Sequence, residues 1–267
     1  MHYPYENHIR ELPLKENGKT MTKKTAPNVC SFLLVVFGVV LPGVAPAEAD
    51  TAIYNLTIDN TWSEVTHPGR VAPTDAHFSW LGGGTHSDQV SFWNVGELAS
   101  PGMVEMAETG VINKFVGEVS VESLKRNAFG PVAWRHWFCP VATTNKSCGE
   151  LSVEFEMDSA FPLVTLVTML GPSPDWFVGT NGLPLYEEGA WLQEVVFDLY
   201  PYDGGTRSAN QWPLGGPRND PAEAISVITE ESGHLVGPAK MGTMTFTLIW
   251  KTAVESSTWA EAKAIPR

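Results

Sequence analysis

The chain has 267 residues, of which 43% are hydrophobic and 18% charged, so it can bury a sizeable core and is not disordered or fibrous in composition. Its formal net charge of −13 excludes the basic surface with which proteins bind nucleic acid or anionic lipid. Ten tryptophans, 24 glycines and 20 prolines favour an aromatic-rich β fold with many tight turns over a helical bundle.

The N-terminal segment has the pattern of a secretion signal. Lys23 and Lys24 form a basic region, residues 31–41 form an apolar run, and Ala47 and Ala49 are the small residues that a signal peptidase requires. The apolar run is much shorter than the roughly 20 residues that a membrane-spanning helix needs. We therefore expect cleavage after Ala49, export to the periplasm or the extracellular space, and no membrane span.

One folded domain is expected between the leader and a short tail. Residues 1–49 form an N-terminal extension and the signal peptide, residues 50–251 form the domain, and residues 252–267 form the tail. Translation starts at either Met1 or Met21, and cleavage removes both. Loss of the leader takes away five basic and four acidic residues and leaves a net charge of about −14, which favours cations or basic partners.

Several segments alternate apolar and polar side chains with the two-residue period of a half-buried β-strand. The clearest are residues 54–59, 151–156 and 243–250. Two nearly continuous apolar runs, at residues 164–170 and 195–199, predict strands that are covered on both faces. Because strands occur near both ends of the domain, we expect one closed sandwich.

Helices are expected only in the middle of the domain. Ser100 fits the N-cap of a helix, Pro101 fits its first position, and Gly110 ends it. Helical spacing of apolar residues then recurs over residues 112–119. The sequence therefore predicts one or two short helices whose apolar stripes are packing surfaces.

Segments rich in Gly, Pro, Asn and Asp predict long loops at residues 79–88, 171–185 and 200–221. The three consecutive glycines at residues 82–84 lack the lysine and hydroxyl residue of a phosphate-binding loop. We interpret them as a flexible turn.

Three histidines near the start of the domain, His67, His77 and His86, are the residues on which a catalytic or metal site could be built. They match none of the helical zinc-binding spacings, and no Gly-x-Ser-x-Gly turn precedes a helix. We therefore expect a protein that is not an enzyme, with these histidines hydrogen-bonded where loops are anchored. The alternatives are an exported hydrolase or metalloenzyme that uses them, and an envelope protein with no adhesive role.

Two cysteines remain after removal of the leader, Cys139 and Cys148. Eight residues of loop-like composition separate them. In an exported protein such a pair favours a disulfide bond, since two thiols alone do not complete the tetrahedral shell of zinc.

Asp175 and Asp203 each lie on a loop that begins where an apolar strand ends, at the rim of the expected sandwich. Carboxylates and free carbonyl groups on such loops are the oxygen ligands that calcium requires. Each Asp can equally cap its own turn by an Asx-type hydrogen bond. The spacing alone leaves both readings open.

A set of short motifs, spread in order over most of the domain, resembles the spondin N-terminal domain family. These motifs are Trp62-Ser63, Thr66-His67-Pro68-Gly69, Ala76-His77-Phe78-Ser79, Thr85-His86-Ser87, Gly96-Glu97-Leu98-Ala99-Ser100, Met106-Ala107-Glu108-Thr109-Gly110, residues 172–179 (PSPDWFVG) and residues 198–203 (DLYPYD). The resemblance implies an all-β antiparallel sandwich like that of calcium-dependent phospholipid-binding domains. It also implies calcium at one edge, a role in cell adhesion and extracellular matrix, and an extracellular protein or glycan, unidentified, as partner.

The resemblance also implies three calcium carboxylates, of which Asp175 and Asp203 match the first two. The third position holds Arg207, a cation in place of an anionic ligand. Either Arg207 points to solvent while carbonyls or waters complete the shell, or its guanidinium binds the two carboxylates as a built-in substitute for the ion. Glu118 aligns with an acidic position of some family members and is a weaker metal candidate. Taken alone, it is expected on a solvated helix face.

Overall fold

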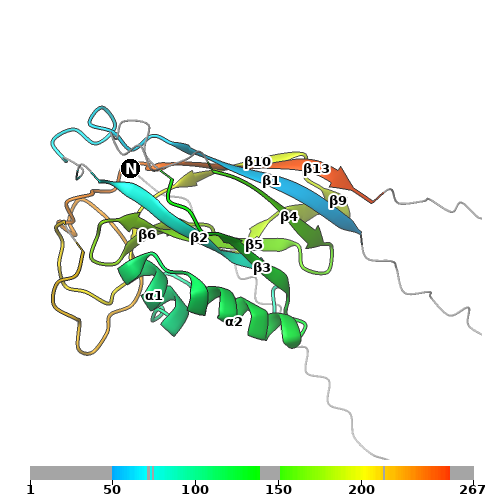
Figure 1. Cartoon of the computed structure of the whole chain (residues 1–267), viewed down its shortest axis with the longest axis horizontal. Coiled ribbons are helices and arrows are strands. Elements are labelled where there is room, and N and C mark those ends of the chain that lie inside the picture. Colours follow the sequence, from blue (N-terminus) through cyan, green and yellow to red (C-terminus); the bar gives the residue numbers. More distant parts are fainter. Residues whose placement is uncertain (1–49, 71–72, 74, 139–150, 213, 253–267) are drawn as a thin grey trace, which may run out of the picture. The chain divides into compact units, whose positions relative to one another are not determined.

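The computed structural model describes residues 50–252 except residues 71–72, 74, 139–150 and 213. Its two main sheets lie one above the other, and two helices cover the outer face of the second sheet (Figure 1).

The first sheet is four-stranded and antiparallel, and it forms the upper layer in Figure 1. In spatial order its strands are β10 (Glu194–Leu199), β13 (Gly242–Lys251), β1 (Thr51–Asn60) and β4 (Ser152–Asp158). Strands β1, β4 and the first part of β13 alternate as the sequence predicts, whereas Trp250 near the end of β13 is exposed, so the predicted alternation is wrong there. In β4, for example, Val153, Phe155 and Met157 are buried. The apolar run in β10 is an exception, because this strand lies at the sheet edge with Val196 exposed, so the prediction of a strand covered on both faces is wrong there.

The second sheet contains the remaining long strands. Along its path the strands are β12 (Ser226–Val227), β11 (Tyr202–Asp203), β6 (Trp176–Gly179), β5 (Leu163–Gly171), β2 (His77–His86) and β3 (Ala128–Trp134), with β7 (Leu183–Pro184) paired to β5. A separate ribbon joins β8 (Tyr186–Glu187) to β9 (Ala190–Trp191). Strand β5 is buried on both faces, as its continuous apolar run predicts, because the first sheet covers one face and the helices cover the other.

The two helices are α1 (Pro101–Thr109) and α2 (Asn113–Leu124). The side chain of Ser100 accepts a hydrogen bond from the backbone N–H of Met103, and Gly110 ends α1 in the left-handed conformation with φ of 71°. Both ends of α1 therefore lie where the sequence predicts them. No helix in the described part of the chain is long and apolar enough to cross a membrane.

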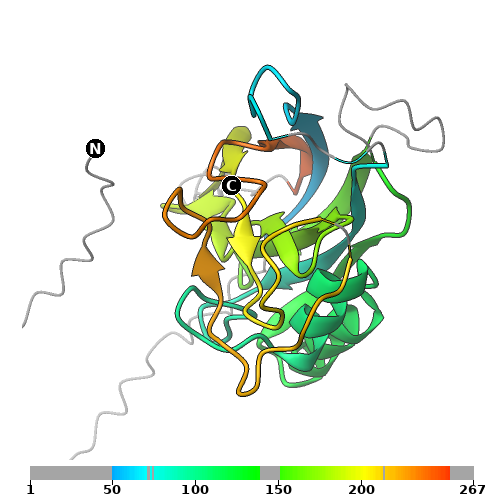
Figure 2. The ribbon, with the colours of Figure 1, turned by 90° about the vertical axis from the view of Figure 1, so that its left-hand side faces the viewer.

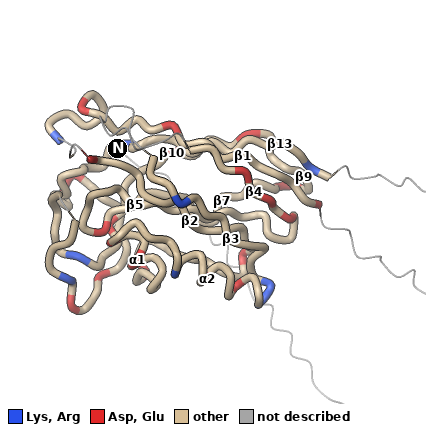
Figure 3. The backbone as a smooth tube through the Cα atoms, viewed as in Figure 1, with Lys and Arg blue, Asp and Glu red and all other residues tan. Residues whose placement is uncertain are grey.

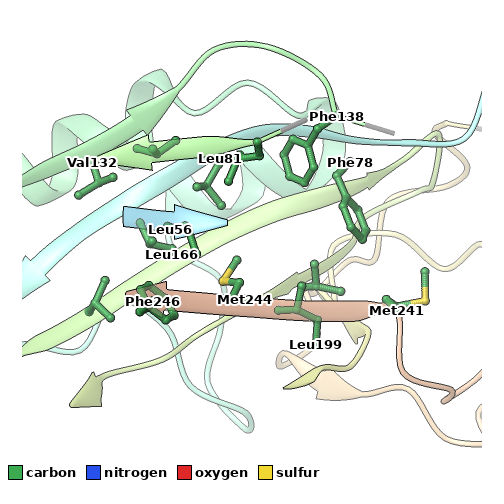
Figure 4. Close-up of a cluster of buried hydrophobic side chains, with 14 of the residues drawn as sticks. Leu56, Phe78, Leu81, Val132, Phe138, Leu166, Leu199, Met241, Met244 and Phe246 are labelled. Atoms are coloured by element: carbon green, nitrogen blue, oxygen red, sulfur yellow. The ribbon is translucent and has the colours of Figure 1, made fainter. Parts of the chain in front are cut away.

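Two hydrophobic clusters hold the layers together. The larger lies between the sheets, where Leu56, Leu166 and Phe246 meet (Figure 4). The smaller lies between the second sheet and the helices and includes Met106 and Phe115. The fold is therefore an antiparallel β-sandwich with two short helices, which confirms the predicted fold class.

The three consecutive glycines lie inside strand β2, so their interpretation as a flexible turn is wrong. A Cβ atom on Gly82 would lie 2.8 Å from Cβ of Ile112, and one on Gly84 would lie 2.5 Å from the carbonyl oxygen of Gly130. A Cβ atom on Gly83 would lie only 1.9 Å from the carbonyl oxygen of Thr165 on β5. The glycines are needed because neighbouring backbone and the helix layer approach β2 more closely than a side chain allows.

This close approach predicts that Gly83→Ala strongly destabilises the fold, whereas Gly130→Ala does not. Alanine at position 83 forces the β2–β5 pairing apart, and overpacking of this kind costs about 1–3 kcal/mol. A Cβ atom on Gly130, in the edge strand β3, meets nothing within 4 Å. Urea unfolding of the two variants and the wild type measures the difference. Equal midpoints for both variants would contradict the packing account.

Candidate functional site

Asp175 lies in the tight turn between β5 and β6, and it is fully buried. The side chain of Ser173 accepts a hydrogen bond from the backbone N–H of Trp176, which shapes this turn. Oδ2 of Asp175 accepts three hydrogen bonds, from the backbone N–H of Thr206 at 2.7 Å, its hydroxyl at 3.0 Å and the backbone N–H of Arg207 at 2.9 Å. One carboxylate oxygen thus joins the turn after β5 to the loop after β11.

The second carboxylate oxygen of Asp175 has a different environment. Oδ1 is buried and has no hydrogen-bond partner among the described residues. The pKa of Asp175 is raised to about 6, mainly by burial and also by the nearby charge of Asp203, while the hydrogen bonds from Thr206 and Arg207 partly oppose this rise. A buried carboxylate beside a second carboxylate is costly to ionise, and no ion pair within the described ranges offsets the charge of Asp175.

Asp203 is the last residue of β11 and pairs in register with Trp176 of β6, so the two sequence-predicted aspartates lie close together. Oδ1 of Asp203 accepts a hydrogen bond from the backbone N–H of Gly205 at 2.7 Å, which is the Asx-type turn expected as the alternative role. Oδ2 lies at hydrogen-bonding distance from Nε2 of His234. No local motif in the sequence marked His234, because the contact joins residues 31 positions apart.

The side chain of Arg207 does not lie where either expectation placed it. Its guanidinium contacts Oε2 of Glu108 on α1 and donates to the carbonyl oxygen of Gly216 at 2.8 Å. The side chain is only 19% exposed, so it does not point to solvent, and only its backbone N–H donates to Asp175. Both expected positions of the Arg207 side chain are therefore wrong, whereas completion of a calcium shell by carbonyls or waters stays a prediction.

Oε2 of Glu108 also accepts a hydrogen bond from the guanidinium of Arg218 at 3.0 Å. The side chain of Glu108 is 6% exposed. Burial alone would raise the pKa of Glu108, but the hydrogen bond and charge of Arg207 and the charge of Arg218 lower it below its ordinary value. Glu108 is therefore ionised at neutral pH. The loops that carry Asp175, Arg207 and Arg218 lie together at one end of the domain (Figure 2). Acidic and basic positions are interspersed at this end (Figure 3).

Glu118 is a residue of α2, and its side chain lies beside the N-terminus of α1, at the opposite end of that helix from Glu108. Its carboxylate accepts hydrogen bonds from the hydroxyl of Ser100 and from the backbone N–H of Gly102, both at 2.6 Å. An anion beside a helix N-terminus satisfies free N–H groups and interacts favourably with the helix dipole. The expectation of a solvated helix face is wrong, since Glu118 is half-buried and joins α2 to the start of α1.

Among the described residues, no group of three or more His, Cys, Asp or Glu side chains is arranged so that it could hold a metal ion. Any ion at Asp175 and Asp203 must therefore take most of its ligands from carbonyl groups or water. Cys139 and Cys148 lie outside the described residues, so their disulfide stays a prediction.

The three N-terminal histidines are buried separately, each with its own partners. His67 contacts the hydroxyl of Thr66, His77 contacts the carbonyl oxygen of Asp75 and stacks on Trp137, and His86 contacts the carbonyl oxygen of Ser87 and the hydroxyl of Thr165. Burial is the main cause that lowers the pKa of both His67 and His86. The structure therefore does not unite these histidines in one site.

One hydrogen-bonded chain has the residue types of a catalytic triad. Nε2 of His234 faces Asp203, and its Nδ1 lies 2.7 Å from the hydroxyl of Ser232. This hydroxyl donates to the carbonyl oxygen of Thr229 at 2.8 Å and accepts from the N–H of the same residue. Its proton is thus used to close a turn, and the arrangement is structural rather than nucleophilic.

Comparison with known proteins agrees with the motifs in the sequence. The family model Spondin_N matches residues 52–236. Spondin-1 of Mus musculus is 36% identical over 186 residues, which cover 67% of this chain and 22% of that protein. Spondin-2 of Rattus norvegicus is 31% identical over 183 residues, covering 68% of this chain and 54% of that protein. Spondin-2 of Homo sapiens is 29% identical over 210 residues, covering 76% and 62%.

The fold and its rim define an antiparallel sandwich module with carboxylates on the loops at one end. The chain belongs to the spondin N-terminal domain family, because the family model matches more than half of it. The recognition made from the sequence motifs is therefore confirmed. The matched part spans about a fifth of Spondin-1 and 54–62% of the Spondin-2 proteins.

The raised pKa of Asp175 predicts a specific pH dependence of stability without calcium. The folded state holds this proton more tightly than the unfolded chain, whose pKa is near 3.8. The stabilisation is therefore complete below pH 3.8 and is lost as pH rises through about 6, with a total of roughly 3 kcal/mol at most.

Asp175→Asn removes this titration. We expect the unfolding free energy of the wild type, relative to the variant, to rise as pH falls from 7.5 to 5 in EDTA. Urea unfolding at several pH values measures it. A constant difference between the two proteins would contradict a raised pKa, and the comparison cancels the opposite contribution of the buried histidines.

Proposed function

We propose that this chain is an exported, non-enzymatic binding module that attaches to an extracellular protein or glycan through its rim loops and binds one calcium ion there weakly. Membership of the spondin N-terminal domain family supports a role in adhesion or matrix association. The observation that carries the calcium proposal is the buried, unpartnered Oδ1 of Asp175 beside a second carboxylate, that of Asp203.

The residues of the rim fit a calcium ion in three respects. Asp175 and Asp203 supply carboxylate oxygens on loops, as a hard cation requires. Oδ1 of Asp175 is unpartnered. The guanidinium of Arg207 is neutralised by Glu108 and so does not occupy the space of the ion as a salt-bridge partner of these aspartates.

The two aspartates supply fewer oxygen ligands than a calcium ion needs, and this shortage determines the affinity that we expect. Calcium takes six to eight oxygen ligands. Oδ2 of Asp175 is used by three hydrogen bonds, and Asp203 is shared with Gly205 and His234. Carbonyl groups and water must supply the rest, so we expect binding in the range of extracellular modules, about 10⁻⁴–10⁻³ M.

The absence of catalysis is supported by the state of the candidate groups. The three N-terminal histidines are separate, and the hydroxyl of Ser232 closes a turn. A hydrolase or metalloenzyme built on these histidines has no shared site in the described residues. Export is supported by the leader-like pattern of the first 49 residues.

Calcium is expected to raise the melting temperature of the wild type at millimolar concentration, because a ligand that binds only the folded state stabilises it. At ten times the dissociation constant the gain is about 1.4 kcal/mol. Asp175→Asn is expected to lose this shift. Asp198→Asn, which removes an exposed carboxylate on β10, is the matched control and keeps it.

Thermal unfolding by circular dichroism measures the calcium effect. Tryptophan fluorescence gives a second signal, because Trp176 follows Asp175 and contacts the edge of His234. An unchanged melting temperature in the wild type at millimolar calcium would rule out the metal.

Binding itself is tested with the purified domain on arrays of matrix proteins and glycans, in calcium and in EDTA. We expect retention that depends on calcium and is lost in Asp175→Asn but not in Asp198→Asn. If no ligand is retained, the protein has no adhesive role. Hydrolysis of chromogenic esters that is lost when His67, His77 or His86 is replaced would instead establish the enzyme alternative.

A further inference from the structure

The position of Arg207 makes its side chain a direct competitor for the proposed cation. Its backbone N–H donates to Oδ2 of Asp175, so its Cα atom lies next to the carboxylate pair. A flexible arginine side chain starting there can reach Oδ1 of Asp175, which is unpartnered. A guanidinium forms strong charge-assisted hydrogen bonds with carboxylates, and two close carboxylates attract it strongly.

The guanidinium nevertheless lies on α1, where Glu108 binds it. Glu108 is the penultimate residue of α1, and its side chain is 6% exposed, so its position is fixed by the packed helix. Arg218 contacts the same carboxylate oxygen, and the backbones of Arg207 and Arg218 form an isolated antiparallel bridge. The carbonyl oxygen of Gly216 accepts a hydrogen bond from Nη1 of Arg207.

We propose that Glu108 is a positioning residue that holds the guanidinium of Arg207 away from Asp175 and Asp203, and thereby prevents it from competing with a divalent cation for this carboxylate pair. The proposal rests on the proposed calcium binding. It explains how a chain with arginine at the third ligand position of its family retains two neighbouring carboxylates that this arginine does not occupy.

A double-mutant cycle on calcium affinity tests the role of Glu108. Wild type, Glu108→Gln, Arg207→Ala and the double variant are titrated with calcium chloride by calorimetry. Glu108→Gln is expected to weaken binding at least about tenfold, because the released guanidinium occupies the carboxylates. Arg207→Ala binds as tightly as the wild type or more tightly, and the double variant recovers the affinity of Arg207→Ala.

The recovery separates this proposal from a purely structural role. If Glu108 only stabilises the loop, the double variant stays as weak as Glu108→Gln or becomes weaker, which overturns the proposal. Glu105→Gln is the matched control, because Glu105 lies one turn earlier on α1 and pairs with Lys114. It removes the same charge from the same helix and is expected to leave calcium affinity within about twofold of the wild type.

A crystal structure of Glu108→Gln without calcium gives a readout that does not depend on metal binding. The proposal expects the guanidinium of Arg207 within hydrogen-bonding distance of Asp175 or Asp203. A guanidinium that stays on Gly216 or turns to solvent overturns it. If none of the four proteins binds calcium, the proposed calcium function fails, and this crystal structure still decides the role of Glu108.

Discussion

The rim of the domain depends on one buried carboxylate, that of Asp175. Its Oδ2 accepts the N–H groups of two consecutive residues and one hydroxyl from the loop that follows β11. An ionised group without water is costly unless it is hydrogen-bonded, so these contacts hold the two loops in one arrangement. The same arrangement places Asp203 beside Asp175 and the backbone N–H of Arg207 on the Asp175 carboxylate. The geometry of the site is therefore a consequence of how this single side chain is satisfied.

Helices α1 and α2 pack closely on the second sheet because three consecutive glycines, residues 82–84, lie at the centre of β2. A Cβ atom on Gly82 would lie 2.8 Å from Cβ of Ile112, and one on Gly84 would lie 2.5 Å from Cγ1 of Val119. The close contact sets the depth at which α2 packs on the sheet. Glu118 on α2 in turn binds the start of α1, whose other end carries Glu108. Packing in the middle of the sheet and charge placement at the rim are thus linked through α1.

The parts of the structure that local pattern determines could be predicted from the sequence. The alternating segments form β1, β4 and β13, and α1 begins after Ser100 and ends at Gly110, as predicted. Both features depend on residues that are close together in the sequence. The pairing of Asp175 with Asp203 followed from the family motifs. The three glycines of β2 were misread, because glycine indicates a turn and a close strand contact equally well, and only the partner strand distinguishes them.

The contacts that could not be predicted join distant residues. Arg207 and Glu108 are 99 positions apart, and Asp203 and His234 are 31 apart, with no shared motif. Glu108 does lie within a matched family motif, but the motif does not reveal that its carboxylate would face Arg207. Arg207 considered alone predicts repulsion of a cation, whereas Arg207 with Glu108 is a neutral pair that does not.

The charge balance at the rim follows from these contacts. Three carboxylates, on Asp175, Asp203 and Glu108, and two guanidinium groups, on Arg207 and Arg218, lie at the rim, and both guanidinium groups contact Glu108. This leaves a smaller excess of negative charge than three aspartates without arginines would give, and ligand charge is one of the properties that set calcium affinity. The proposed weak binding suits the proposed location outside the cell, because calcium there is abundant and a dissociation constant near 10⁻³ M still allows occupancy. The proposed calcium binding is therefore compatible with arginine at position 207 only while Glu108 holds its guanidinium.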